Sequence, residues 1–286
     1  MTPSSPAVVA LIVHHSPLTP AERVGAHQCL AMLQSHPIMV VAPEGLELPR
    51  ELRRLPAERF PAGCFASVRD YNRLMLSPEF YGRFSAHEYL LIHQLDAFVF
   101  RDELREWCAK GYDYLGAPWR GVLFPDSGEW SELLRPFLPP GGAETWRGRT
   151  RVGNGGLSLR RVETLRKTLI RLDPVRKAWG DRHEDAFWGI AARLCLPESE
   201  YRLPSEEEAL PFAWETKPEE CYRLLGRLPF GCHAWDKVAP AFWRPWIRKA
   251  GYRVHVPGDG GWQDRLAAGA NQARKFFGPK ARREAE

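Results

Sequence analysis

The sequence lacks the segments that would insert it into a membrane or direct it to export. No apolar run approaches the roughly 20 residues that a membrane-spanning helix needs. The N-terminus has neither the basic start nor the small-residue cleavage site of a signal peptide. Since 44% of the residues are apolar and 12% aromatic, the chain has ample material for a large core. We therefore expect a soluble, cytoplasmic protein.

Paired cysteines and a concentrated basic surface are also missing. The six cysteines include no C-x-x-C pair, so neither a zinc knuckle nor a disulfide framework is indicated. The formal net charge is +5, and bases and acids interleave along most of the chain. This balance suits small anionic substrates but is not the footprint of a nucleic-acid-binding protein, so we expect no nucleic-acid partner.

What the N-terminal third does contain is an alternation of strands and helices. Ala7–Val13 and Ile38–Ala42 read as buried strands, and between them Thr19–Glu22 has the T-x-x-E capping box that opens a helix. Tyr89–Leu95 is a third, strongly apolar strand. The pattern predicts an α/β fold of one domain, with a mostly parallel, Rossmann-like central sheet and helices on both faces.

Further elements are expected downstream of the third strand. Turn chemistry and periodicity predict a helix capped by Asp102 and ended by Gly111, a strand at 112–117, and helices near 161–172 and 184–194.

Residues 118–150 are rich in Pro, Gly and Trp and show no periodicity, so they read as long loops and suggest a lid over a ligand. The alternative is that the tryptophans merely cover an irregular surface. We divide the chain into a main domain, 1–246, and a C-terminal extension, 247–286.

The extension ends in a basic segment, Trp262–Glu286, with aromatic anchors. Its composition suggests weak peripheral contact with an anionic membrane surface. A solvated terminus is the alternative, because Gly269, Gly278 and Pro279 interrupt any helix.

Four short segments carry residue types that bind ligands or do chemistry. Gln94 and Asp96 follow the third strand, where ligands bind in open α/β sheets, and a carboxylate there suits a hard divalent cation. Asn154, Gly155 and Gly156 permit positive φ and close approach of backbone to a ligand. The ordinary alternatives are a turn-capping Asp and a hairpin turn, and the absence of a following GK[ST] argues against a phosphate-binding P-loop.

The other two segments lie in the second half of the chain. Glu184 and Asp185 open a helix, whose dipole keeps carboxylates ionised, so one of them is a candidate general base; simple capping is the alternative. His233 lies among apolar and aromatic residues and is either a metal ligand or a core histidine.

Six stretches together carry a resemblance to a known family. They are YNRLML, EYLLIHQLDAFVF, WCAKGYDYLGAPW, VGNGGLSLR, HEDAFW and LPFGCHAW, between about Val8 and Trp243. They resemble a family of uncharacterised, predicted glycosyltransferase-like proteins of the GT-A type. The resemblance implies a GT-A-like fold and a metal-dependent transfer of sugar from a nucleotide-sugar donor.

The resemblance also implies roles for individual residues. Asp96 matches the last Asp of the DxD element and, with His233, would hold Mn²⁺ or Mg²⁺. Gln94 stands where the first Asp of that element would be, and its amide retains the ability to hydrogen-bond a ribose hydroxyl. Asp185 matches the catalytic base of inverting members, with Glu184 beside it.

Two further implications concern the donor and the acceptor. Asn154, Gly155 and Gly156 match the glycine-rich loop beside donor and acceptor sugar. His14 lies where the nucleotide base should sit, at the end of the first strand, although no motif match supports it.

The reaction implied is glycosyl transfer from a nucleoside diphosphate sugar to the hydroxyl of a glycan, lipid-linked or other acceptor, in glycan biosynthesis and with inversion preferred. Two alternatives stay open: a sugar nucleotidyltransferase, for which the first strand lacks a glycine-rich, basic signature, and a non-catalytic sugar- or nucleotide-binding module on the same fold.

Overall fold

The computed structural model describes residues 7–120, 127–139 and 152–253. In chain order the first elements are β1 (Ala7–Ile12), α1 (Pro20–Met32), β2 (Ile38–Pro43), β3 (Ala57–Phe60), η1 (Ala62–Phe65), α2 (Val68–Met75), α3 (Pro78–Gly82), β4 (Tyr89–Gln94), β5 (Phe98–Val99), α4 (Leu104–Ala109), β6 (Tyr114–Leu115), β7 (Ala117–Pro118), α5 (Ser127–Leu134) and η2 (Arg135–Phe137). They continue with β8 (Val152–Gly153), β9 (Leu157–Arg161), α7 (Val162–Arg171), α8 (Asp173–Trp179), α9 (Glu184–Ala186), η3 (Phe187–Ala192), α10 (Arg193–Cys195), α11 (Glu206–Ala209), β10 (Ala213–Trp214), α12 (Pro218–Leu225), β11 (Gly231–Cys232) and α13 (Pro240–Lys249).

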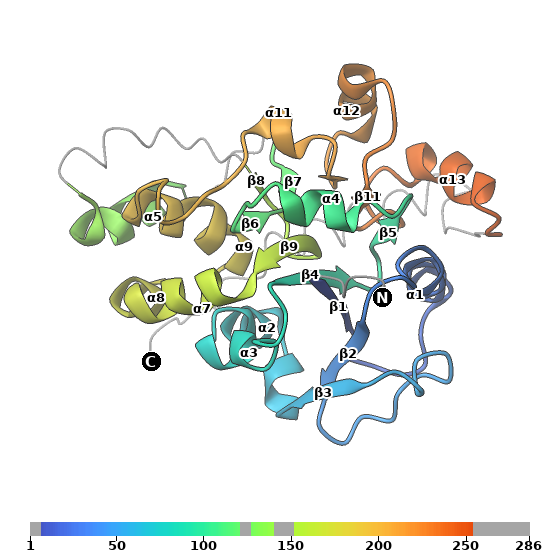
Figure 1. Ribbon diagram of the computed structural model, residues 1–286, viewed down its shortest axis with the longest axis horizontal. Coiled ribbons are helices and arrows are strands. Elements are labelled where there is room, and N and C mark those ends of the chain that lie inside the picture. The colour runs from blue at the N-terminus through green and yellow to red at the C-terminus, as the bar shows by residue number, and fades with distance from the viewer. Residues whose placement is uncertain (1–6, 121–126, 140–151, 254–286) are drawn as a thin grey trace, which may run out of the picture.

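A six-stranded mixed sheet forms the centre of the molecule, in the order β3-β2-β1-β4-β9-β6 (Figure 1). Strands β3, β2, β1 and β4 are parallel, and β9 runs antiparallel between β4 and β6. Every residue of β1 is buried, because the sheet is covered on both faces. The predicted α/β fold with a mostly parallel sheet is confirmed.

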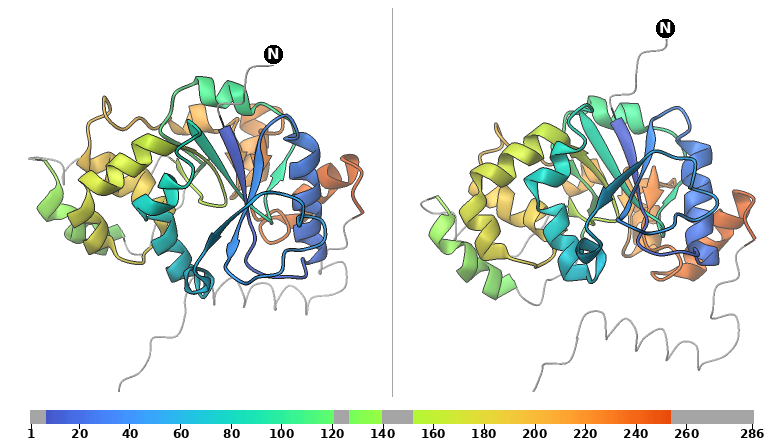
Figure 2. Two further views of the ribbon diagram at one scale, coloured as in Figure 1. Left: turned by 60° about the horizontal axis from the view of Figure 1, so that its bottom comes forward. Right: turned by 90° about the horizontal axis from the view of Figure 1, so that it is seen from below.

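Helices cover the two faces of this sheet. Figure 2 shows α1 on one side of the strands and α2, α3 and α7 on the other. Helix α1 begins where the sequence predicts: Thr19 is the N-cap, and the side chains of Thr19 and Glu22 complete a capping box. The β1-α1-β2 unit is the predicted crossover between adjacent parallel strands.

Helix α4 starts slightly differently from the prediction. Its N-cap residue is Glu103, which makes no side-chain cap, although the Asp102 carboxylate accepts a hydrogen bond from the Leu104 N–H (3.3 Å). The same carboxylate also accepts from Ser35 and contacts the His36 ring. Asp102 therefore ties the helix start to the loop that leads into β2.

The single strand predicted at 112–117 is instead two short strands in different sheets. Strand β6 joins the central sheet, whereas β7 pairs with β8. The chain changes sheet at Gly116, where an added Cβ would lie 1.6 Å from the carbonyl oxygen of Gly153. This close backbone contact requires glycine, and it breaks the strand.

The expectation of long loops at 118–150 is wrong for its described middle part. Residues Ser127–Leu134 form α5, and the Trp130 side chain is buried. The centroids of the Trp130 and Trp179 rings are 5.2 Å apart. Trp119 is buried too, against Gly153. These two tryptophans pack in the interior. Residues 121–126 and 140–150, on which the lid prediction also depends, lie outside the described residues.

The last described elements form most of a second, smaller core beside the main one. Strands β10, β11 and β5 form a three-stranded sheet, and its buried aromatic residues pack against α13. Helix α13 runs across the boundary expected at 246/247, and Ile247 is fully buried. The basic segment Trp262–Glu286 lies outside the described residues. Within the described ranges, no helix is long and apolar enough to cross a membrane.

Candidate functional site

The carboxyl ends of β1 and β4 bring two of the predicted segments together. Ile12 pairs with Gln94 in the sheet register, so His14 and Asp96 leave adjacent strands at the same edge. His14 interacts electrostatically with both Asp96 and Lys237. Because ligands bind at this edge of an open α/β sheet, it is the place where a site is expected.

Asp96 is the centre of a charge cluster drawn from two distant parts of the chain. Its Oδ1 lies 3.2 Å from Nε2 of His233, and its Oδ2 lies 2.6 Å from Nζ of Lys237. Burial alone would raise the pKa of Asp96, but the charges and hydrogen bonds of His233 and Lys237 outweigh it and hold the pKa well below its usual range. Asp96 is thus an anion at every physiological pH.

His233 is held from both of its ring nitrogens. Nδ1 lies 3.1 Å from Oε1 of Glu215, and Nε2 lies 3.2 Å from Oε1 of Gln94 as well as contacting Asp96. Burial alone would lower the pKa of His233, but Asp96 and Glu215 raise it to about 10. The imidazole is therefore protonated when no cation is bound, and a metal ion at Nε2 has to displace that proton.

These donors fit a divalent cation. An octahedral ion with metal–oxygen distances of about 2.0–2.1 Å places neighbouring ligands about 3 Å apart, close to the separation between Asp96 Oδ1 and His233 Nε2. Glu215 on Nδ1 orients the ring in the way that carboxylates orient metal-binding histidines. The Lys237 side chain, which is 53% exposed, contacts the other carboxylate oxygen of Asp96, so the ammonium does not engage Oδ1.

The glycine-rich segment links two sheets and is not a hairpin turn. Strand β8 before it pairs with β7, and β9 after it pairs with β4 and β6. Asn154 adopts a positive φ of 68°, and its Oδ1 accepts a hydrogen bond from the Gly156 N–H (2.9 Å). A Cβ on Gly156 would lie 2.1 Å from His233 Nε2, and one on Gly155 would lie 1.9 Å from Glu184 Oε1. Both glycines therefore make room for predicted site residues.

Asp185 is half-buried at the start of α9 and is anchored by backbone donors. Its Oδ2 accepts from the Asn154 N–H (3.1 Å) and its Oδ1 from its own neighbour, Ala186 (2.9 Å). Burial raises the pKa of Asp185, with His183 opposing and Glu215 adding to the rise. Glu215 thus interacts with both His233 and Asp185, which brings the second, third and fourth segments to one place.

Glu184 faces the opposite way, into the protein. It is 3% exposed, and its Oε1 accepts a hydrogen bond from the buried Arg160 guanidinium (2.8 Å). Arg160 also donates to Ser158 and Tyr81. Burial raises the pKa of Glu184 to about 6, against the lowering effect of Arg160. Glu184 therefore supports the glycine-rich loop from within and offers no carboxylate to a bound substrate.

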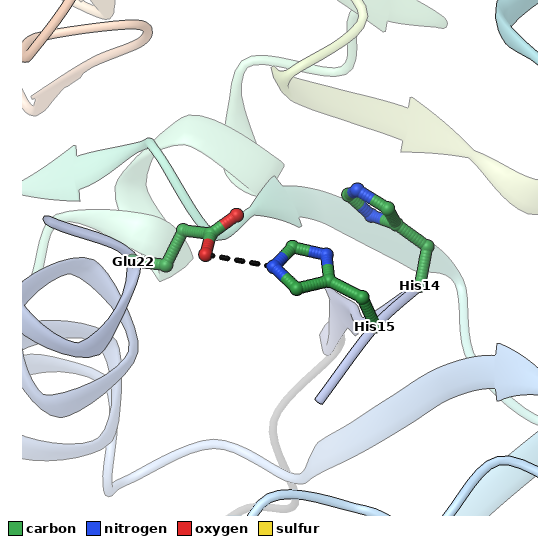
Figure 3. A group of neighbouring side chains, drawn as sticks. All are labelled: His14, His15 and Glu22. Atoms are coloured by element: carbon green, nitrogen blue, oxygen red, sulfur yellow. Dashed lines mark hydrogen bonds and ion pairs between the residues drawn. The ribbon is translucent and has the colours of Figure 1, made fainter. Parts of the chain in front are cut away.

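A second group of potential metal ligands lies beside this cluster. His14, His15 and Glu22 each offer one ligand atom, and these atoms lie within 4.8 Å of one another. His15 Nε2 lies 3.0 Å from Glu22 Oε2. Figure 3 shows the His15 ring turned toward Glu22, with the His14 ring beside it. His14 is exposed by surface area, but neighbouring groups remove part of its hydration, and this desolvation together with the charge of His15 lowers its pKa.

The structure therefore brings together most of the residues singled out in the sequence. The His233 ring contacts Gln94 and Asp96 and lies against Gly156. His14 interacts electrostatically with Asp96, and the Asn154 N–H of the glycine-rich loop donates to Asp185.

Sequence reasoning missed Glu215, Lys237 and Arg160. Glu215 follows the short strand β10, and an acidic residue directly after a strand was the one signal that pointed to it. Lys237 and Arg160 carried no such signal.

A family model matches residues 54–233, more than half of the chain, and includes every one of the four predicted segments. The family is described as "Protein of unknown function (DUF5672)". The chain belongs to this family. No curated protein matches the DUF5672 chain in sequence.

Solved structures of GT-A glycosyltransferases resemble this DUF5672 protein. An active-site mutant of LgtC is 14% identical, with 91% of this chain and 100% of that chain covered and a TM-score of 0.50. Mouse xyloside xylosyltransferase 1 in its apo form is 10% identical over 79% of this chain and 96% of that one (TM-score 0.48). Core-mannan synthase A (CmsA/Ktr4) from Aspergillus fumigatus, in an Mn/GDP form, is 9% identical, with 70% of this chain and 72% of that chain covered (TM-score 0.45). The match to LgtC shows that the fold is GT-A-like.

Proposed function

We propose that this DUF5672 protein transfers a glycosyl group from a nucleoside diphosphate sugar to an acceptor hydroxyl, with the help of a divalent cation. One observation carries the proposal. Asp96, Gln94 and His233 converge at the carboxyl edge of a GT-A-like sheet. The glycine-rich loop links them to the half-buried carboxylate of Asp185, because Gly156 lies against His233 and the Asn154 N–H donates to Asp185. A cation site and a candidate base beside one another are what this transfer needs.

Asp96 Oδ1 and His233 Nε2 would hold Mn²⁺ or Mg²⁺, with the Gln94 amide oxygen as a third donor in reach. When bound, such a cation neutralises the charge that develops on a diphosphate leaving group. Lys237 would add a second positive charge next to the cation, because its half-exposed ammonium is paired with the Asp96 carboxylate (2.6 Å). Mn²⁺ is the first cation to test, because carboxylate and carbonyl oxygens are donors that suit it.

Asp185 would accept the proton of the acceptor hydroxyl. It is anchored by the Asn154 and Ala186 N–H groups, and burial raises its pKa, which makes it a stronger base than an exposed aspartate. A base on the acceptor side favours in-line attack and inversion at the anomeric carbon. Glu184 would serve as a positioning residue, since it is paired with Arg160 in the interior.

The proposal is tested by binding of nucleotides in the presence and absence of Mn²⁺. Calorimetric titration with UDP, GDP and CMP should find one nucleotide that binds tightly only with Mn²⁺. D96N and H233A should each abolish this metal-dependent binding while leaving the far-UV circular dichroism spectrum unchanged.

The matched control is D102N, which alters another His–Asp pair away from the site. In that pair, Asp102 Oδ1 lies 2.9 Å from His36 Nε2. D102N should bind nucleotide and Mn²⁺ like the parent. Metal-dependent binding that survives in D96N and H233A would overturn the assignment of the site. Indifference of the parent to all three nucleotides would instead favour a non-catalytic module on this fold.

A further inference from the structure

The end of β1 carries a cluster of imidazole and carboxylate groups that the proposed transfer does not use. His14 and His15 follow the strand directly, and Glu22 comes from the first turn of α1 (Figure 3). Within residues 7–120, 127–139 and 152–253, these three residues form the one group of three or more His, Cys, Asp or Glu side chains whose ligand atoms converge closely enough for a metal ion.

We propose that His14, His15 and Glu22 form a binding site for one transition-metal dication, with Zn²⁺ as the cation it fits best. The three ligand atoms lie within 4.8 Å of one another, and the His15 Nε2 to Glu22 Oε2 distance is 3.0 Å. Tetrahedral zinc with bonds of about 2.0–2.1 Å places its ligands about 3.4 Å apart. The His15–Glu22 distance is slightly shorter than this value and the 4.8 Å limit is longer, so side-chain rotation, above all of His14, has to bring the three ligands to equal spacing.

The carboxylate of this group is already oriented. Glu22 Oε2 accepts a hydrogen bond from the Thr19 N–H (2.8 Å) as half of the α1 capping box. The Glu22 side chain is only 15% exposed, so its rotamer is restrained. An outer partner that fixes a ligand in this way is a regular feature of metal sites, and it reduces the entropy lost on binding.

The donor types select the class of cation. Two imidazoles and one carboxylate suit Zn²⁺ and its neighbours among the late transition metals, whereas Mg²⁺ and Ca²⁺ prefer sites in which most ligands are oxygen atoms. Three protein ligands leave a fourth tetrahedral position for water. Since His14 is exposed and the His15 side chain is 38% exposed, a cation reaches the group from solvent without opening the fold.

This site is distinct from the one around Asp96 and does not depend on the proposed function. Neither Asp96 nor His233, which contact each other, belongs to the His14–His15–Glu22 group. The Lys237 ammonium lies 2.6 Å from the Asp96 carboxylate. The two sites are neighbours, however, because His14 interacts electrostatically with Asp96 and Lys237. A zinc ion at His14 would therefore add positive charge at the edge of the sheet where Asp96 lies.

The experiment measures Zn²⁺ binding by calorimetry and Co²⁺ binding by its ligand-field absorption, on the untagged full-length chain carrying D96N to weaken the neighbouring site. One Zn²⁺ should bind, and Co²⁺ should give the intense visible bands of a tetrahedral complex. H15A and E22Q should each weaken Zn²⁺ binding by more than the about 10- to 100-fold that follows loss of a group that only orients a ligand.

E22Q is the sharper of the two variants, because its amide oxygen can still accept from Thr19 and keep the helix start intact. The control is H27A, which removes an exposed histidine from the same helix, α1, and should leave Zn²⁺ affinity unchanged. Failure of the D96N chain to bind Zn²⁺, or equal affinity in H15A, E22Q and H27A, would overturn the site. Loss of nucleotide binding in D96N alone bears on the proposed function and not on this one.

Discussion

At the scale of single residues, the adjacent carboxylates of Glu184 and Asp185 have opposite environments. Glu184 is buried against Arg160, whereas Asp185 is half-buried and held by backbone N–H groups near Glu215. Successive residues at a helix start point in different directions, so the pair divides into one interior and one outward group. This division gives each residue a separate, testable role.

D185N should retain donor binding and lose turnover. The amide is nearly isosteric and can still accept one backbone hydrogen bond, but it does not take up a proton near neutral pH. We expect kcat to fall by about 10²- to 10⁴-fold, the usual contribution of a general base, with the Kd for donor little changed. Steady-state kinetics together with calorimetry measure both quantities. Near-parental kcat would reduce Asp185 to a helix-capping role.

Glu184 should make the free energy of unfolding depend on pH. Its pKa is raised from an ordinary 4.5 to about 6 in the folded protein, so the folded state holds the proton more tightly. Stability from this group is present below about pH 4.5 and is lost as the pH rises through 6. The parent's free energy of unfolding relative to that of E184Q should therefore fall across this interval, as measured by urea denaturation.

The control for this comparison is E163Q. Glu163 is exposed and pairs with Arg166, which lowers its pKa, so its contribution has the opposite sign. The free energy of unfolding of the parent, taken relative to that of E163Q, should not fall as the pH rises from about 4.5 to 6. An identical fall for both variants would mean that the effect does not come from the buried Arg160–Glu184 pair.

At the scale of elements, the loop between β8 and β9 acts as a spacer: it contains glycines at Gly155 and Gly156, and the absence of a Cβ there leaves room for Glu184 and His233. An added Cβ at Gly156 would meet the His233 ring, and one at Gly155 would meet the Glu184 carboxylate. The backbone of the loop is in turn fixed by the Gly156 N–H to Asn154 bond and the Gly156 carbonyl to Gln94 bond. Movement of the loop away from β4 would break the bond between the Gly156 carbonyl and the Gln94 N–H.

G156A should therefore displace the His233 imidazole and weaken metal-dependent nucleotide binding at least tenfold, with a smaller change in stability. The comparison is G63A, because a Cβ on Gly63 meets nothing within 4 Å and its φ is not in the left-handed region. Calorimetry with Mn²⁺ and nucleotide measures the binding, and thermal denaturation measures the stability. Equal affinities in the two variants would contradict the spacer role.

At the scale of the whole molecule, the candidate site lies where two hydrophobic cores meet. The main core contributes β1 and β4, and the smaller core of β5, β10, β11 and α13 presents His233 and Glu215. Trp243 and Ile247 of α13 are fully buried in the smaller core. The cation site proposed around Asp96 and His233 would therefore depend on how firmly the smaller core is attached to the main one.

W243A should destabilise the protein by about 3–5 kcal/mol, the usual range for a buried Trp→Ala change, and should weaken nucleotide binding with it. The matched surface variant is L224S, since Leu224 is 57% exposed and such changes alter stability by only about ±0.5 kcal/mol. Urea denaturation gives the free energies. A W243A protein as stable as L224S would show that the smaller core contributes little.

The sequence by itself determined the elements whose signals are local. Strand β1, the capping box of α1, strand β2 and strand β4 lie where the predicted ranges put them, because alternation, β-branched runs and capping residues act over a few positions. Local signals failed in α5, where Pro and Gly nearby concealed a helix that is stabilised by burial of Trp130. There, tertiary contact outweighed intrinsic preference.

Only the tertiary structure decided which side chains meet. The Lys237 ammonium donates to the Asp96 carboxylate, which is 141 positions away in the chain. The buried Arg160 guanidinium donates to Glu184, which is 24 positions away. His15 and Glu22 are only 7 positions apart and meet because the loop after β1 leads directly into the first turn of α1. Propensity and capping act between near neighbours in the chain, whereas the Lys237–Asp96 and Arg160–Glu184 pairs form only after distant strands and helices pack together.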